Sequence, residues 1–151
     1  MMQLHFQTII LRDLQKLKDE INSYTNEATM WQPLPGTTNT GGNLALHLIG
    51  NLRHFIGAEL GNSGYIRERE AEFNSRNVPL ATLNALLETC ISEVTHAFYQ
   101  LDPERMSAPF PKEIGGQTRE TAFALLHLTG HLSYHLGQIN YHRRYFNSQN
   151  S

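Results

Sequence analysis

The chain has 151 residues, of which 40% are hydrophobic and 17% charged, and its formal net charge is −2. This length suits one domain around a single core, so we expect one domain over residues 1–151. Lys and Arg are scattered along the chain, which argues against a nucleic-acid partner. The N-terminus lacks the layout of a signal peptide, and no segment is apolar enough to span a membrane. We therefore expect a cytoplasmic protein with neither nucleic acid nor membrane as its partner.

Amphipathic segments follow one another along the chain, and the first three precede residue 102. Residues 4–24 carry apolar side chains at steps of three and four, as a helix with one buried face requires. Residues 43–60 repeat this pattern after a Thr/Asn/Gly-rich start, at residues 37–42, that offers capping groups. Residues 79–101 carry the single cysteine, Cys90, in their apolar stripe. We expect this thiol to be buried and inert, because reactive cysteines lie in exposed, electropositive places.

The fourth segment begins near Thr118, a predicted N-cap, and ends near Phe146. Pro- and Gly-containing stretches separate the segments, and alternating strand patterns are absent. Four helices with one apolar stripe each predict an all-α fold, a four-helix bundle. The connections are longer than the roughly two to eight residues usual in such bundles, which leaves room for a crossover connection.

Six of the eight histidines lie in the second and fourth predicted helices. On a wheel of about 100° per residue, the polar side chains of the fourth helix share an arc of about 80°: His127, His131, His135, Gln138 and His142. Leucines lie on one side of this arc. Aromatic and apolar side chains lie on the other: Phe123, Leu126, Tyr134 and Tyr141. We therefore expect the histidines to lie in the middle of the buried surface of this helix.

The second helix offers a partner for these histidines. His47 and His54 share a face with Asn43 and Asn51, and this face carries no charged residue. A solvent-exposed face would more usually carry Lys and Glu. The pattern indicates an enclosed polar interior between the second and fourth helices.

Two histidines four residues apart on a helix can bind one metal ion together. A third histidine across the core completes a set of three neutral nitrogens, which leaves a coordination position open, as in catalytic sites. The wheel does not choose between the pairs His127/His131 and His131/His135 on the fourth helix. It does not choose between His47 and His54 on the second helix either. Ligating histidines usually donate their other N–H to an acceptor, and the candidates for this orienting role, or for lining the pocket, are Asn51, His54, His127 and Gln138.

Several known metal sites do not fit these residues. HLSYH lacks the glutamate of the H-E-x-x-H motif of zinc proteases. Carboxylate-bridged di-iron bundles need two Glu-x-x-His pairs, and this chain has one such spacing, Glu93 to His96. A hemerythrin-like site would need a carboxylate four residues after His47 or His54, and those positions hold Asn51 and Ala58. A mononuclear site remains, where the metal would act on a bound water or thiol.

The piece HLSYHLGQI, with LALHLIGNLRHFIG and the turn WQPLPG upstream, resembles the DinB/YfiT-like superfamily of proposed metalloenzymes. GYIREREAEF, residues 64–73, also resembles a segment of one branch of that family. The resemblance covers nearly the whole chain and implies a four-helix bundle with a crossover connection. It also implies that the three metal ligands are His47, His131 and His135.

The resemblance further implies an activity. Characterised relatives include metal-dependent thiol S-transferases, so we expect a divalent transition metal, zinc or nickel, a low-molecular-weight thiol and a small electrophilic substrate. One alternative is a metal-dependent hydrolase in which water replaces the thiol. Another is a non-catalytic bundle that binds metal or a partner for regulation. Because many relatives are dimers, a homodimer is a further expectation.

Overall fold

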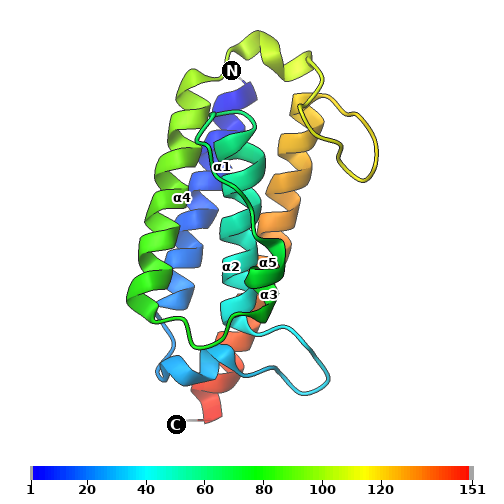
Figure 1. Ribbon diagram of the computed structural model, residues 1–151. Helices are drawn as coiled ribbons and strands as arrows, with labels where there is room; N and C mark the ends of the chain where they lie inside the picture. Colours follow the sequence, from blue (N-terminus) through cyan, green and yellow to red (C-terminus); the bar gives the residue numbers. More distant parts are fainter. Residues whose placement is uncertain (1, 150–151) are drawn as a thin grey trace.

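A computed structural model describes residues 2–149, and four long helices dominate it (Figure 1). They form a bundle, which confirms the predicted all-α class, and they have these bounds: α1 Met2–Ile21, α2 Gly41–Leu52, α4 Leu80–Gln100 and α5 Thr121–Gln149. A short helix, α3, spans Arg69–Asn74. No helix within residues 2–149 is long and apolar enough to cross a membrane.

The helix order includes a crossover. Helices α1 and α5 run in one direction along the bundle, whereas α2 and α4 both run in the other (Figure 1). Helices α1 and α2 each contact α4 and α5 more than they contact each other, so these two consecutive helices lie on a diagonal of the bundle. Because α2 and α4 are parallel, residues 59–79 must return along the length of the bundle between them. We call residues 59–79 the crossover segment, and α3 lies within it.

The core consists of the apolar stripes that the sequence predicts. It is built from fully buried side chains of all four long helices, including Leu14, Leu48, Leu87 and Leu125. Cys90 lies among them, and burial raises the pKa of its thiol to about 12. The prediction of an inert, buried thiol is therefore confirmed.

The beginning of α2 is fixed by capping and by close packing. The hydroxyl of Thr40 accepts a hydrogen bond from the backbone N–H of Asn43, at 3.1 Å, and so caps the helix. A Cβ atom at Gly42 would lie 2.7 Å from the indole ring of Trp31, so only glycine allows this approach. The last part of the second predicted helix, Arg53–Ala58, has π-helical geometry, which often occurs at functional sites.

The fourth long helix begins later than the sequence predicts. Thr118 is not its N-cap, because α5 begins at Thr121. The stretch before α5 makes backbone contacts of its own, since Gln117 pairs with Ile114 and Glu120 with Pro109. The backbone N–H of Thr121 in turn donates to the carbonyl of Ala108 at 2.9 Å. These long-range contacts override the local capping signal.

One flank of α5 is exposed, contrary to the prediction that the histidine arc lies in the middle of a buried surface. Its apolar side chains have the following exposed fractions: Phe123 44%, Leu126 61%, Tyr134 66% and Tyr141 72%. The reason is that α5 packs mainly on α1 and α2, so within residues 2–149 no long helix covers this flank. The histidine arc therefore lies at the edge of the buried surface.

Candidate metal centre

Three histidines from two helices meet between α2 and α5. His47 of α2 and His131 and His135 of α5 each offer a ring nitrogen, and these nitrogens all lie within 4.8 Å of one another. The closest pair is Nε2 of His47 and Nε2 of His131, at 3.0 Å. His47 is buried, and the other two side chains are half-buried. This group, which we call the histidine cluster, could hold a metal ion.

The crossover segment supplies a carboxylate to His47. Nδ1 of His47 lies 3.1 Å from Oε2 of Glu72, whose side chain is 6% exposed. Arg67 holds the same carboxylate with two hydrogen bonds, from Nε to Oε1 at 2.7 Å and from Nη2 to Oε2 at 2.9 Å. Nη2 of Arg67 also lies 3.3 Å from Nδ1 of His47, but the carboxylate is the shorter contact and the acceptor of this group, which favours donation of Nδ1–H to Glu72. In that tautomer, Nε2 of His47 carries a lone pair that faces the other two histidines.

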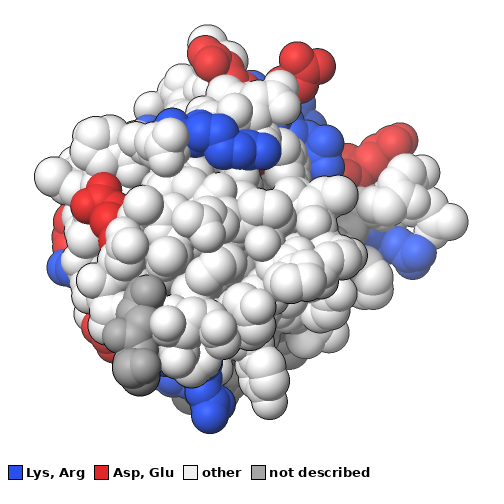
Figure 2. Space-filling view, turned by 90° about the horizontal axis from the view of Figure 1, so that it is seen from below, with Lys and Arg blue, Asp and Glu red and all other residues white. Residues whose placement is uncertain are grey.

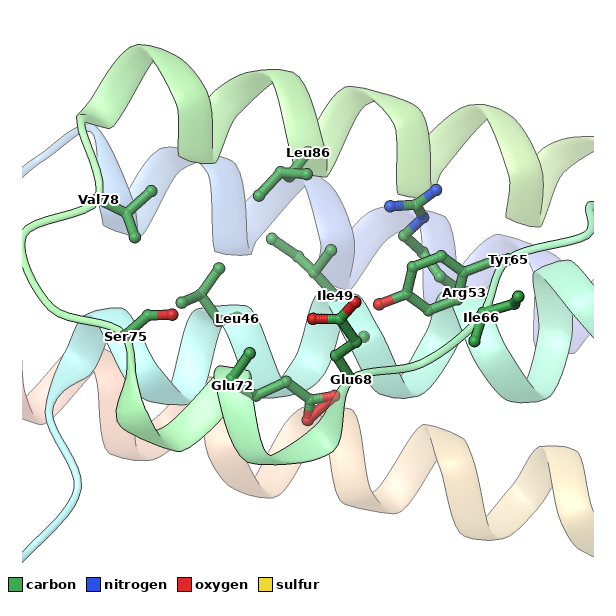
Figure 3. Close-up of a pocket in the computed structure, with 12 residues that line it drawn as sticks. Leu46, Ile49, Arg53, Tyr65, Ile66, Glu68, Glu72, Ser75, Val78 and Leu86 are labelled. Atoms are coloured by element: carbon green, nitrogen blue, oxygen red, sulfur yellow. The ribbon is translucent and has the colours of Figure 1, made fainter.

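Glu72 is a carboxylate at neutral pH. Burial alone would raise its pKa, but the hydrogen bonds from His47 and Arg67 outweigh burial and hold the pKa below its usual value. Space for the carboxylate comes from Gly50 of α2, where a Cβ atom would lie 2.2 Å from Oε1 of Glu72. Gly50 and Glu72 also form part of the wall of a cavity of about 290 Å³ between α2, α4 and the crossover segment (Figure 3). The histidine cluster does not line this cavity.

The two histidines of α5 differ in their partners. Nδ1 of His135 lies 2.6 Å from Oε1 of Gln138, so donation to this amide leaves Nε2 free as a ligand. Nδ1 of His131 is buried and has no hydrogen-bond partner among the described residues, and the same holds for Oδ1 of Asn51. An unsatisfied buried nitrogen is costly, and Nε2 of His131, not this nitrogen, faces His47.

His131 and His135 are neutral at pH 7, because the pKa of each is lowered. Burial, followed by the charges of His135, His47 and His127, lowers the pKa of His131 to about 4. Burial also lowers the pKa of His135, against a hydrogen bond to the amide oxygen of Gln138 that raises it. Because a histidine must be neutral to bind a metal ion, this donor set fits a transition metal at physiological pH.

These depressed pKa values predict an acid-sensitive apoprotein. The unfolded chain binds a proton at His131 near pH 6.5, whereas the folded chain does so only near pH 4, so stability is present above about pH 6.5 and falls as the pH drops towards 4. After allowance for screening at a half-buried side chain, we expect His131 to contribute about 1–2 kcal/mol to this fall. Urea unfolding of the apoprotein at pH 7.5 and 4.5 measures it. The pH dependence should be smaller in a His131→Asn variant, and an equal dependence would contradict the prediction.

The other residues predicted for the site have varied surroundings. Gln138 contacts His135, as described, and Asn51 is buried one turn after His47. His127 is exposed, although its ring stacks on that of His131 with centroids 6.4 Å apart. His54 is half-buried in the π-helical turn, where its ring contacts Phe55.

Glu72 and Arg67 are the residues at this centre that sequence reasoning missed. The available signal was the segment of residues 64–73, which resembles a segment of one family branch but has no metal-ligand spacing.

Asn43, expected to share a polar interior with His47, instead holds the crossover segment, because its amide donates to the carbonyls of Glu72 and Ser75 at 2.9 Å each. His142 has a structural role, since its ring nitrogens contact the hydroxyl of Tyr24 and the carbonyl of Gln32, both at 2.7 Å.

A second cavity, of about 470 Å³, is lined by Gln138, the hydrogen-bond partner of His135. It lies between the loop before α2, the beginning of α2 and the exposed side of α5. The remaining wall combines threonine and asparagine side chains with Leu34 and Leu44, and none of its residues is Asp, Glu, Lys or Arg. The end of the molecule that carries this loop also presents a mostly uncharged surface, with scattered Lys, Arg, Asp and Glu (Figure 2). This cavity suits an uncharged organic group.

Comparison with protein-family profiles gives a match. The sequence profile described as the DinB superfamily matches residues 10–139, which include four long helices in part or whole and all three members of the histidine cluster. No curated protein matches the chain.

Proposed function

This chain belongs to the DinB superfamily, and on that premise we propose that it is a metal-dependent enzyme that transfers a small thiol to an electrophilic molecule. His47, His131 and His135 hold one divalent cation in this proposal. The observation that carries it is the convergence of three ring nitrogens within 4.8 Å of one another, contributed by two helices.

The donor set favours zinc or nickel. Neutral imidazoles suit these borderline ions, whereas magnesium and calcium prefer oxygen ligands. Three protein ligands leave a coordination position for a substrate, and a cation bound there would lower the pKa of a thiol so that it ionises near neutral pH. The chain orients two of the three imidazoles through Glu72 and Gln138.

The proposed reaction is a substitution. The thiol sulfur attacks an electrophilic carbon, a C–S bond forms, and the leaving group departs with its bonding electrons while the thiol proton passes to solvent. The uncharged cavity beside Gln138 would bind the organic part of a substrate and exclude water from it.

A thiol fits the site better than an attacking water, which is the hydrolase alternative. Hydrolysis generally uses a base to take a proton from the water. Glu72 is the carboxylate in contact with the histidine cluster, but it binds Nδ1 of His47, away from the nitrogen that faces His131, and Arg67 engages both of its oxygens. Zinc and nickel also bind a soft sulfur donor better than a hard oxygen donor, which favours a bound thiol over a bound water.

The test compares native protein with a His131→Ala variant, each incubated with the same concentration of zinc or cobalt. Cysteine, glutathione and coenzyme A are offered with a halogenated nitroaromatic, and product absorbance is followed. We expect at least one thiol to alter the cobalt spectrum and to be transferred only by the metal-loaded native protein. Metal-dependent turnover of esters or amides, with no thiol changing the spectrum, would support the hydrolase. Metal binding without turnover of any of these substrates would support a non-catalytic role.

Two further expectations stay predictions. One is the cytoplasmic location. The other is a homodimer, for which the exposed apolar flank of α5 would offer a contact surface, formed by Phe123, Leu126, Tyr134 and Tyr141.

A further inference from the structure

The crossover segment is attached to α2 at the turn that carries His47. The side chain of Asn43, one turn earlier in α2, donates to two carbonyls of the segment and accepts a 2.8 Å hydrogen bond from Nη1 of Arg76. Glu72 then contacts His47 from the same segment. Contacts at two successive turns of α2 therefore fix how α3 lies on this helix.

Both α2 and the crossover segment have residues that support the contact between Glu72 and His47. Glu72 is buried although it is charged, and Gly50 of α2 leaves the space that its carboxylate occupies. Arg67 neutralises the carboxylate with two parallel hydrogen bonds, an arrangement that also restricts its orientation. Burial of a charge lowers stability unless opposite charges and hydrogen bonds replace the lost hydration. Arg67 and His47 provide these contacts to Glu72.

We propose that Glu72 is a positioning residue for the metal ligand His47, and that it couples the docking of the crossover segment to metal binding. This inference rests on the proposed function, because it concerns the same metal centre. A carboxylate that accepts Nδ1–H fixes the tautomer and the ring orientation of a ligating histidine and increases the electron density at Nε2. His47 thereby presents Nε2 towards His131 and His135 before any metal arrives.

The coupling follows from thermodynamic reciprocity. If docking of the crossover segment increases metal affinity by some factor, then metal binding must stabilise the docked segment by the same factor. Among the described residues, two charged side chains contact the histidine cluster, Glu72 and Arg67, and both belong to the crossover segment, since Nη2 of Arg67 lies 3.3 Å from Nδ1 of His47. His135 instead has an amide partner, and Nδ1 of His131 has none. The effect should therefore be specific to the crossover segment.

The main test is metal affinity, measured with zinc alone by competition with a chelator. We expect Glu72→Gln to weaken zinc binding by about 10- to 100-fold, the usual effect of removing a partner that orients a ligand. Glu70→Gln is the matched control, because Glu70 lies on the same short helix but is exposed, and it should bind zinc as the native protein does. Gly50→Ala is a second variant that keeps all charges, and its added Cβ atom should displace the Glu72 carboxylate and weaken binding in the same direction.

A double-mutant cycle separates positioning from general destabilisation. In a His47→Ala background, Glu72→Gln should have little further effect on zinc affinity, because the residue through which it acts is absent. Hydrogen exchange gives an independent readout: zinc should protect the amides of Arg69–Asn74 in the native protein but much less in Glu72→Gln.

Three outcomes would overturn the inference. Native zinc affinity in Glu72→Gln would overturn it while leaving the proposed function intact. An equal loss in the His47 and His47→Ala backgrounds would assign Glu72 a purely structural role. Failure of the native protein to bind zinc at all would instead overturn the proposed function, and the inference with it.

Discussion

Replacement of His131 or His135 with alanine is expected to abolish stoichiometric metal binding. Protein purified without chelator should hold about one transition-metal ion per chain, since three imidazole nitrogens converge within 4.8 Å. Either variant leaves two ligands, and its loss of affinity should exceed the roughly 10- to 100-fold that follows removal of an orienting partner. Elemental analysis of purified protein and chelator competition measure both quantities.

His5→Ala is the control for this experiment. His5 is an exposed residue of α1 and is not part of the histidine cluster, so its replacement should leave the metal content unchanged. Full metal retention in both helix-α5 variants would show that the cluster does not hold the ion.

Replacement of His47 with alanine is expected to lower metal affinity far more than replacement of its neighbours. Nε2 of His47 lies 3.0 Å from Nε2 of His131, whereas His54 is outside the cluster and His127 is exposed. His47→Ala removes the ligand that α2 contributes and also leaves the buried Glu72 without one partner. Isothermal titration with zinc, with each protein checked for folding by circular dichroism, gives the comparison.

The controls are His54→Ala and His127→Ala, which should change zinc affinity by about 10-fold or less. Equal losses in His47→Ala and His54→Ala would contradict the assignment of His47 as the ligand that α2 contributes in preference to His54.

The sequence predicted the helices well because their signal is local. Apolar residues at helical spacing define α1 and α4 to within a few residues of their observed ends, and burial of Leu14 and Leu87 follows directly from that spacing. The beginning of α5 was predicted wrongly, since backbone pairing with residues 108–114 decides it. The exposed flank of α5 could not be foreseen either, because helical spacing shows which side chains share a face but not which faces a neighbouring helix covers.

The candidate site was predictable only in part for a similar reason. The four-residue spacing of His131 and His135 indicates a shared ligand, but the choice of this pair and of His47 came from the family resemblance. Glu72 lies 25 positions after His47, so no helical spacing connects the two residues. They meet because the crossover segment returns along α2. The neighbours of Glu72 on α3, Glu70 and Arg69, look equally polar in sequence, and only the three-dimensional path of the crossover distinguishes them.

The separation of the ligands along the chain has a kinetic consequence. His47 and His131 are 84 positions apart, and their nitrogens meet only when α2 and α5 have already packed together. We expect contacts of this kind to form late, after the transition state for folding, in which case they change the rate of unfolding more than the rate of folding. A bound ion would therefore do little to help the chain find its fold, but it would lengthen the lifetime of the folded molecule.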